Sequence, residues 1–335
     1  MRIFNKDTSK DVVVIAEIGV NHKGSIDWIL NMLPKVKDSG ADAIKFQLFT
    51  PDLYSTRGNL PRYEQISAFY ISEKVFLQIK KSCDSIDLPI FATPVSHDWV
   101  QFIADTCGVI KIASGDFTFT PTVEAALNTA AQLIISSGAT SRTEVIEFVK
   151  LAKQIRQGNS YNETIAMLHC ISSYPPPIEE SNLSAIVDLN KLTELTIGFS
   201  SHFLEDAPLF TALGLGARIF EIHVTDDRSR NDIRDHALSR TTSELKVIIK
   251  LLNNLNTSLL SGKKAIQNSE KGSINNLRKG IVYAKDLRRG HKLVRGDFDF
   301  ARPYNPEIPD LELAIGRVLK KDVEAFFTVA NSDLE

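Results

Sequence analysis

Eight apolar segments of strand length alternate with helical patterns in this chain, and this alternation constrains its fold more than any other feature. The first segment, residues 12–18, is apolar and β-branched, which is typical of a buried strand. Ser25 can cap the helix that follows, Gly40 can end it, and a second apolar strand begins at Ala43. The same pattern recurs at residues 88–93, 109–112, 132–135, 164–169, 195–199 and 218–222. Eight strands, each followed by a helix, predict a (β/α)8 TIM barrel rather than a doubly wound sheet.

Two stretches depart from this alternation. Residues 51–63 contain two prolines and a Gly-Asn pair, which predicts a long irregular loop that acts as a lid. Beyond residue 256 the chain becomes rich in Ser, Asn, Lys and Gly, and then shows short apolar pairs between turn residues. We therefore predict a catalytic barrel over residues 1–256, a linker over 257–279 and a small, mostly β domain over 280–335. The polar N-terminal residues are expected to lead straight into the first strand.

Charge and cysteine content exclude several classes of partner. The formal net charge of −2 gives no bulk attraction to nucleic acid or to an anionic membrane surface, so we expect neither as a partner. We also expect no signal peptide and no membrane span. The cysteines Cys83, Cys107 and Cys170 are widely spaced and form no CxxC pair, which favours reduced thiols in a cytoplasmic protein.

Polar residues interrupt or follow the apolar strands. Glu17, Asn21, Lys45 and Gln47 stand at or just beyond the carboxyl ends of the first two strands, which is where parallel α/β folds bind ligands. Lys111 occupies the equivalent place in a later strand. A lysine with a buried stem needs a partner for its ammonium group, so a salt bridge to a barrel acid is one explanation for each. The other is a phosphate cradle completed by hydroxyl groups at further strand ends, namely Thr93, Ser114, Ser136, Ser137 and Ser200.

Two histidines follow the seventh and eighth strands. His202 and His223 are each a structural residue or, taken together, the imidazole ligands of one divalent cation. With oxygen donors around them, Mn²⁺ or a similar ion such as Mg²⁺ or Co²⁺ fits better than a closed zinc site. His236 is a possible third member or a loop histidine.

Two further residues have both a functional and a structural interpretation. Glu17 is a candidate for proton transfer or hydroxyl binding, or the salt-bridge partner of Lys45 or Lys111. Tyr174 lies in the proline-stiffened segment SSYPPP, where its ring stacks on a ligand or closes the barrel mouth.

The motifs, taken in order, resemble a known family. AEIGVNH, ADAIKFQ, FATPVS, IKIASGD, LIISSG, LHCISSYPPP, IGFSSH and IFEIH occur in the series typical of sialic acid synthases of the NeuB type. The segment IVYAKDLRRGHKLVRGDFDFARP is similar to their C-terminal antifreeze-like (SAF) domain.

This resemblance implies a metal-dependent transferase reaction that condenses phosphoenolpyruvate with an N-acyl hexosamine, giving a nonulosonic acid and phosphate. Lys45, Lys111 and the hydroxyl groups of Thr93, Ser114, Ser136 and Ser200 would hold phosphoenolpyruvate. Mn²⁺ would be bound by His202 and His223. By the same resemblance, sugar hydroxyls and protons would be handled by Glu17, Gln47, Tyr174 and Asp235. Arg302 would reach into the active site of the partner subunit, which makes a domain-swapped homodimer the expected assembly.

Several positions depart from the family pattern. Asp116 and Ser172 would bind substrate by the same resemblance, but Asp116 replaces a glutamate and Ser172 stands where asparagine or serine is found. Ser201 replaces an aspartate. Ile222 replaces a basic residue, and Pro303-Tyr304-Asn305-Pro306 follows Arg302 in place of glycines. The metal histidines and both lysines remain, which favours an active enzyme with an altered acceptor. Two alternatives stay open: a catalytically silent sugar-phosphate-binding paralogue, and a synthase for legionaminic or pseudaminic acid. A deoxy-octulosonate-type condensation is disfavoured by the tail domain.

Overall fold

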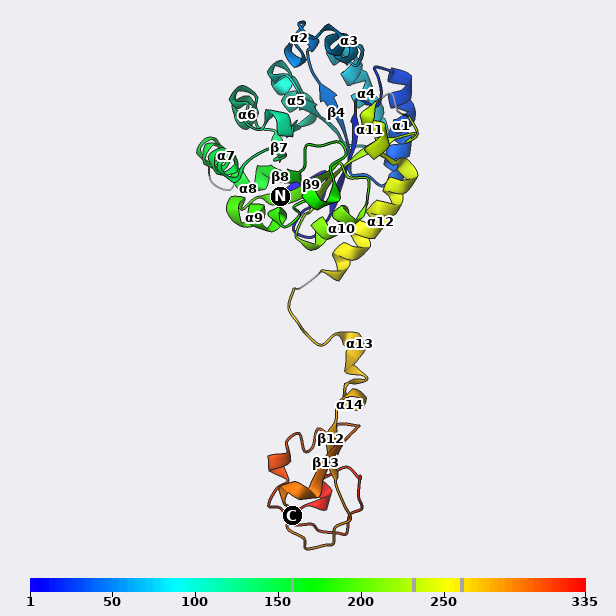
Figure 1. Ribbon diagram of the computed structural model, residues 1–335, viewed down its shortest axis with the longest axis vertical. Coiled ribbons are helices and arrows are strands. Elements are labelled where there is room, and N and C mark those ends of the chain that lie inside the picture. The colour runs from blue at the N-terminus through cyan, green and yellow to red at the C-terminus, as the bar shows by residue number, and fades with distance from the viewer. Residues whose placement is uncertain (158–159, 231–232, 260–261) are drawn as a thin grey trace. The chain divides into compact units, whose positions relative to one another are not determined.

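The computed structural model describes residues 1–157, 160–230, 233–259 and 262–335, and it divides into two compact units, Met1–Leu260 and Ser261–Glu335. In the first unit, β3 to β10 run parallel in chain order, and β10 pairs with β3 to close the sheet into a barrel (Figure 1). The strands are β3 Val13–Gly19, β4 Ala43–Leu48, β5 Ile90–Pro94, β6 Val109–Ile112, β7 Gln132–Ser136, β8 Ile165–Cys170, β9 Thr196–Ser201 and β10 Ile219–Thr225. The predicted TIM barrel is confirmed.

Helices surround the barrel as the apolar periodicity predicts. Ser25 caps α1 (Ile26–Ser39) by accepting from the Trp28 amide, and Gly40 ends the helix at φ 85°, where a residue without Cβ is favoured. The remaining helices that cover the barrel are α4 Glu73–Ser85, α5 Val100–Cys107, α6 Thr120–Leu127, α7 Arg142–Ile155, α8 Ser160–Thr164, α9 Ala185–Thr193, α10 Ala207–Gly214 and α12 Thr242–Ser258. Among the described residues, no helix is long and apolar enough to cross a membrane.

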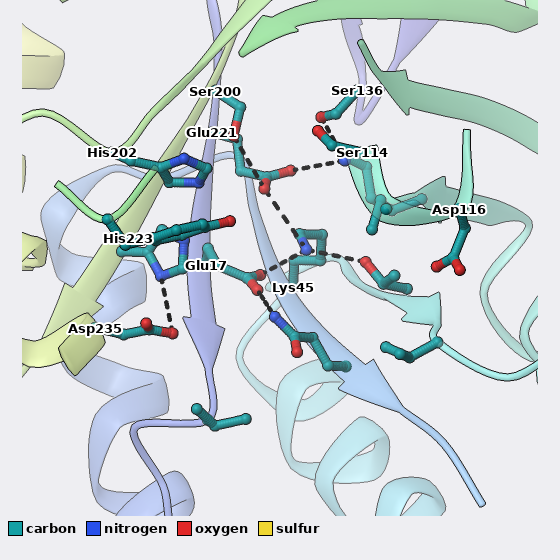
Figure 2. Close-up of a pocket in the computed structure, with 18 of the residues that line it drawn as sticks. Glu17, Lys45, Ser114, Asp116, Ser136, Ser200, His202, Glu221, His223 and Asp235 are labelled. Carbon is teal, nitrogen blue, oxygen red and sulfur yellow. Dashed lines mark hydrogen bonds and ion pairs between the residues drawn. The ribbon is translucent and has the colours of Figure 1, made fainter. Parts of the chain in front are cut away.

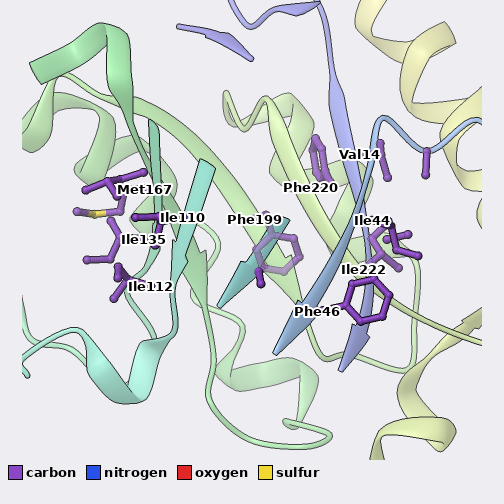
Figure 3. Close-up of a cluster of buried hydrophobic side chains, with 14 of the residues drawn as sticks. Val14, Ile44, Phe46, Ile110, Ile112, Ile135, Met167, Phe199, Phe220 and Ile222 are labelled. Atoms are coloured by element: carbon purple, nitrogen blue, oxygen red, sulfur yellow. The ribbon is translucent and has the colours of Figure 1, made fainter. Parts of the chain in front are cut away.

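Side-chain alternation divides the apolar residues of the barrel into two clusters. Residues such as Val14, Ile44 and Phe220 point outward and pack beneath the helices (Figure 3). Val13, Ile15 and Phe91 belong to a second cluster inside the barrel. Along β3 the inward row therefore runs from Val13 and Ile15 to Glu17, from apolar at the amino end to charged at the carboxyl end.

The amino end of the barrel is closed by a hairpin that the sequence interpretation missed. The N-terminal segment forms two short antiparallel strands, β1 (Arg2–Ile3) and β2 (Lys6–Asp7), rather than leading straight into β3. Ile3 joins the interior cluster, and the Phe4 ring lies 5.2 Å from that of Phe91. The polar composition concealed the hairpin because its apolar contact comes from few residues, Met1, Ile3 and Phe4.

The predicted irregular loop over residues 51–63 is wrong in part. It contains α2 (Pro51–Tyr54) and the start of α3 (Leu60–Ala68). Both prolines lie in the first turn of a helix, where the missing amide hydrogen costs nothing and the fixed φ is favourable. Asn59 caps α3 by accepting from the Arg62 amide. Further along, Ile66 of α3 and Phe69, which follows α3, pack with Phe49 and Ile233 in a small apolar cluster.

The second unit is a small fold around Tyr283, which is fully buried. Its antiparallel sheet pairs β12 (Gly280–Tyr283) with β13 (Phe298–Ala301). The other predicted apolar pairs contribute single bridges, Lys292 with Val318 and Thr328 with Val282. The segment expected as a linker holds the last residues of α12 and two short helices, α13 (Asn268–Lys271) and α14 (Ile274–Leu277).

Candidate active site

A cavity of about 600 Å³ opens at the carboxyl ends of the barrel strands. The predicted site residues that line it are Glu17, Lys45, Gln47, Thr93, Lys111, Ser114, Asp116, Ser136, Tyr174, Ser200, His202, His223 and Asp235 (Figure 2). Ser172 is exposed and does not line this cavity, although it lies close to Gly138. Arg302 belongs to the second unit, where it is exposed and its Nε donates to the Leu277 carbonyl at 2.7 Å.

Two buried lysines and two buried glutamates form the floor of the cavity. Lys45 Nζ lies 2.9 Å from Glu17 Oε2 and 3.6 Å from Glu221 Oε1. Lys111 Nζ lies 3.8 Å from Glu221 Oε2. The salt bridge foreseen between Glu17 and Lys45 is therefore present, and both lysines still face the cavity. Buried charges of this kind are retained only with partners, because isolated burial is costly.

Glu221 is the acid that the sequence interpretation overlooked. It precedes His223 by two positions on β10, so strand alternation turns both side chains to the same face of the sheet. A second signal was available, since two buried lysines need more negative charge than Glu17 alone supplies. Glu221 lies within ion-pair distance of both ammonium groups.

The two glutamates differ in acidity because their surroundings differ. Burial opposes ionisation of Glu221, but Lys111 and Lys45 outweigh it and hold its pKa at about 2. Burial raises the pKa of Glu17, and the attraction of Lys45 only partly offsets this rise. Burial also raises the pKa of Asp116, to about 6, against the opposing effect of Lys111. Asp116 is thus the carboxyl group of the cavity best placed to exchange a proton near neutral pH.

Hydroxyl groups surround the lysines. Lys111 Nζ donates to Ser136 Oγ at 2.6 Å, and Lys45 Nζ donates to Thr93 Oγ1 at 3.0 Å. Ser114 Oγ accepts from the Gly138 amide at 3.1 Å. A Cβ on Gly138 would lie 2.7 Å from this hydroxyl oxygen, so the close approach requires glycine. Ser137, also foreseen as a member of the cradle, instead donates to the Leu168 carbonyl and does not line the cavity.

The two predicted metal ligands lie next to each other. The ring centroids of His202 and His223 are 5.4 Å apart. Nδ1 of His202 lies 2.8 Å from the Ile171 carbonyl oxygen, which fixes the ring and leaves Nε2 for a ligand. Burial lowers the pKa of His223 to about 4, and its buried Nδ1 has no hydrogen-bond partner in the structure. A neutral imidazole with an unpaired nitrogen suits a cation, so these residues fit the implied metal ion.

The remaining ligands of such an ion would come from water or substrate. The described residues contain no group of three or more histidine, cysteine or acidic side chains suited to a metal. His236 does not line the cavity; its Nδ1 lies 2.8 Å from Thr225 Oγ1, so it is not a third member. Asp235 Oδ2 is 4.0 Å from His223 Nδ1, too far for a hydrogen bond, so this nitrogen remains available to a ligand.

Several other lining residues were not foreseen. Cys170 lines the cavity, and its Sγ lies 3.7 Å from His202 Nδ1. Burial alone would raise the pKa of this thiol, but the nearby His202 and Lys111 hold the pKa below its usual value. The cavity is also lined by side chains from α2, from α3 and from the residue that follows α3, namely Tyr54, Arg62, Gln65, Ile66 and Phe69. Arg234 lines it from α11 (Arg234–Leu238). The predicted lid over residues 51–63 indicated this region of the chain, but it did not predict which side chains line the cavity.

A parallel barrel with coupled lysines, glutamates and histidines at its carboxyl rim defines a TIM-barrel enzyme. Residues 32–264 match the NeuB family model, and residues 278–334 match the SAF domain model. The chain belongs to the NeuB family.

Individual relatives agree with this assignment. The chain is 33% identical to an uncharacterized protein of Methanocaldococcus jannaschii, over 93% of this chain and 91% of that protein. It is 28% identical to the N,N'-diacetyllegionaminic acid synthase of Legionella pneumophila, over 98% of this chain and 96% of the synthase. A crystal structure of N-acetylneuraminic acid synthetase from Leptospira borgpetersenii in complex with citrate superposes with a TM-score of 0.73 and 30% identity, covering 79% of this chain and 90% of that one.

Proposed function

We propose that the chain condenses phosphoenolpyruvate with an N-acyl hexosamine, assisted by a divalent cation, to give a nonulosonic acid and phosphate. One observation carries the proposal: two buried ammonium groups and two adjacent imidazoles face the same cavity. The ammonium groups suit a small trianion, and the imidazoles suit a cation beside it. The related legionaminic and pseudaminic acid synthases support an acceptor of the N-acyl amino sugar class.

The lysines and hydroxyl groups bind phosphoenolpyruvate in this proposal. Lys111 with Ser136, and Lys45 with Thr93, provide charged and neutral donors that are already oriented by their mutual hydrogen bonds. Ser114 and Ser200 add further donors at the strand ends.

His202 and His223 would hold the divalent cation, Mn²⁺ or a similar ion. Such an ion, when bound, supplies Lewis-acid polarisation of the acceptor carbonyl. Tyr174 stacks on His202 with ring centroids 4.0 Å apart and so keeps the imidazole in place. Gln47 and Asp235 orient the hydroxyl groups of the acceptor, and Gln47 is itself held by a 3.0 Å hydrogen bond to Glu17.

The covalent steps need three proton transfers. The C3 carbon of the enol attacks the acceptor carbonyl carbon, and a carbon–carbon bond forms while the carbonyl oxygen takes up a proton. The Glu17–Lys45 pair, joined at 2.9 Å on the floor of the cavity, supplies that proton. Water then adds at C2, and Asp116 accepts one of its protons. The bond between C2 and the phosphate oxygen breaks, the C2 hydroxyl group passes its proton to the departing phosphate, and a ketone remains at C2.

Phosphate release tests this function directly. The purified protein is incubated with phosphoenolpyruvate, Mn²⁺ and a panel of N-acyl hexosamines, and free phosphate is measured. We expect release only when a sugar and the metal are both present. No release with any sugar, despite measurable metal binding, would favour the catalytically silent sugar-phosphate-binding alternative.

We also propose a cytoplasmic homodimer in which Arg302 of one subunit completes the cavity of the other. The free cysteines Cys83, Cys107 and Cys170 support the location, and the exposure of Arg302 supports the exchange. Mixing inactive Lys111→Met and Arg302→Ala proteins after reversible dissociation tests the exchange, because hybrid dimers regain one intact site. No recovery of activity in the mixture would rule out a shared site.

A further inference from the structure

The mouth of the cavity carries two arginines that the proposed chemistry does not use. Arg62 on α3 and Arg234 on α11 both line the cavity, and both side chains are exposed. They lie on neighbouring parts of the rim, because Ile233, next to Arg234, packs with Ile66, one helical turn after Arg62.

Both guanidinium groups are held by aromatic rings rather than buried in strong ion pairs. Arg62 lies over the Tyr54 ring at 5.7 Å and donates to Gln65 Oε1 at 2.8 Å. Within the described residues it has no carboxylate partner. Arg234 lies over the Tyr174 ring at 4.5 Å, and its Nε is 3.6 Å from Asp235 Oδ1. Stacking orients a guanidinium group while leaving its charge and most of its donors for a ligand.

Charge is distributed unevenly between the floor and the mouth. On the floor, Lys45 and Lys111 are matched by Glu17 and Glu221. At the mouth, Asp235 is the carboxylate near Arg234, and His223 beside it is neutral. Among these described residues of the mouth, the two guanidinium groups therefore face one carboxylate.

The Tyr174 ring contacts both the imidazole pair and one of the two arginines. Tyr174 lies between the two groups, 4.0 Å from the His202 ring and 4.5 Å from the Arg234 guanidinium. If the acceptor carbonyl meets the imidazole pair, the far end of the sugar extends past Tyr174 toward the arginines.

We propose that Arg62 and Arg234 form a subsite for an anionic group on the acceptor, so that the preferred substrate is an N-acyl hexosamine bearing a phosphate or carboxylate at the end distant from its carbonyl. This inference rests on the proposed function and narrows its substrate class. Arginine is suited to both anions because its planar fork binds two oxygens at once.

The test compares each sugar of the panel as the free hexosamine, its 6-phosphate and the corresponding uronic acid. We expect kcat/KM for one of the charged forms to exceed that of the free sugar by at least about tenfold, the effect of a charge-assisted hydrogen bond. Arg62→Gln and Arg234→Gln should each reduce this preference by about tenfold, and the charged form that shows it identifies the anion. Arg57→Gln and Arg228→Gln are matched controls that should leave the preference unchanged, because these arginines pair with Asp52 and Glu244 and do not line the cavity.

Equal use of charged and free sugars by the wild-type protein would overturn the subsite, even with the proposed function intact. A preference that persists in the Arg62→Gln/Arg234→Gln double variant would overturn it as well. If no acceptor is turned over, the proposed function fails, and calorimetric titration with the sugar 6-phosphates and uronic acids decides the subsite separately. Binding that the double variant loses would support it, and no binding to the wild-type protein would overturn it.

Discussion

The two ends of the barrel are built from the same strands but are organised for opposite purposes. At the amino end, the inward residues Val13, Ile15 and Phe91 pack with Ile3 of the hairpin in an apolar cluster. At the carboxyl end, the same rows end in charged groups, and the buried polar atoms without a hydrogen bond there include Asn21 Oδ1, Ser201 Oγ and His223 Nδ1. Unsatisfied polar atoms are costly when buried, so the carboxyl end gives up stability that the amino end supplies. Substitutions at the two ends should therefore separate activity from stability.

The largest effect is expected at the carboxyl end, from Lys111→Met. We expect kcat/KM for phosphoenolpyruvate to fall by at least about 10³-fold, or about 4 kcal/mol, because a buried charge that faces the anion is lost. The unfolding midpoint should change little, since Met preserves volume and Glu221 keeps Lys45 as a partner at 3.6 Å. Steady-state kinetics and denaturant unfolding measure the two quantities. Unchanged kinetics would remove Lys111 from the site.

The opposite result is expected at the amino end, from Ile3→Ala. This side chain is 3% exposed within the interior cluster, and its truncation should lower the free energy of unfolding by about 2–3 kcal/mol. The kcat of the folded enzyme should not change, because the cavity lies at the other end of the strands. A large loss of kcat at full occupancy of the native state would contradict this separation of the two ends.

The sequence predicted the barrel because its strands are apolar and its helices are capped and amphipathic. Ser25, Gly40 and the strand β6 at residues 109–112 lie where local chemistry alone places them. The hairpin at the amino end was missed, since its stability comes from contacts such as Phe4 with Phe91 that no local pattern reveals. Pro51 and Pro61 were interpreted as loop signals because proline both ends helices and begins them.

The site was predictable where side chains stand at strand ends, and less so elsewhere. Lys45, Lys111, His202 and His223 share one cavity because parallel strands bring their carboxyl ends together. Glu221 could have been found from its spacing to His223. Arg62 and Arg234 could not be found in this way, because their place at the mouth depends on the tertiary packing of Ile66 in α3 with Ile233 beside α11.

A third test at the carboxyl end uses pH. The pKa of Asp116 is about 6, so at lower pH the carboxyl group is protonated and cannot accept the proton of water. We expect kcat to fall about tenfold per pH unit below pH 6, equivalent to about 1.4 kcal/mol per unit. Asp116→Asn should remove this acidic limb from the residual activity. An unchanged limb in the variant would assign it to another group.

The same residue makes a prediction about stability. The pKa of Asp116 is about 6 in the folded protein, above its ordinary value of 3.8, so the unfolded chain loses its proton first as pH rises. Ionisation of Asp116 therefore lowers stability as pH rises from about 4 to 6, and that cost persists at neutral pH. Asp116→Asn should raise the unfolding midpoint at pH 7 but not at pH 3. This outcome would show directly that a carboxyl-end residue is kept at a cost to stability.

The smallest effect is expected for a charged pair at the amino end. Lys6 Nζ lies 2.7 Å from Asp42 Oδ1 and also donates to the Val12 carbonyl, which ties the hairpin to the start of the barrel. Burial raises the pKa of Asp42, and the Lys6 hydrogen bond opposes that rise. Lys6→Met should lower the free energy of unfolding by about 1 kcal/mol, because the pair is only partly buried. The exposed Lys10→Met is the control and should have no measurable effect. If Lys6→Met instead reduced kcat, the two ends of the barrel would be coupled, and the division between a stabilising amino end and a catalytic carboxyl end would not hold.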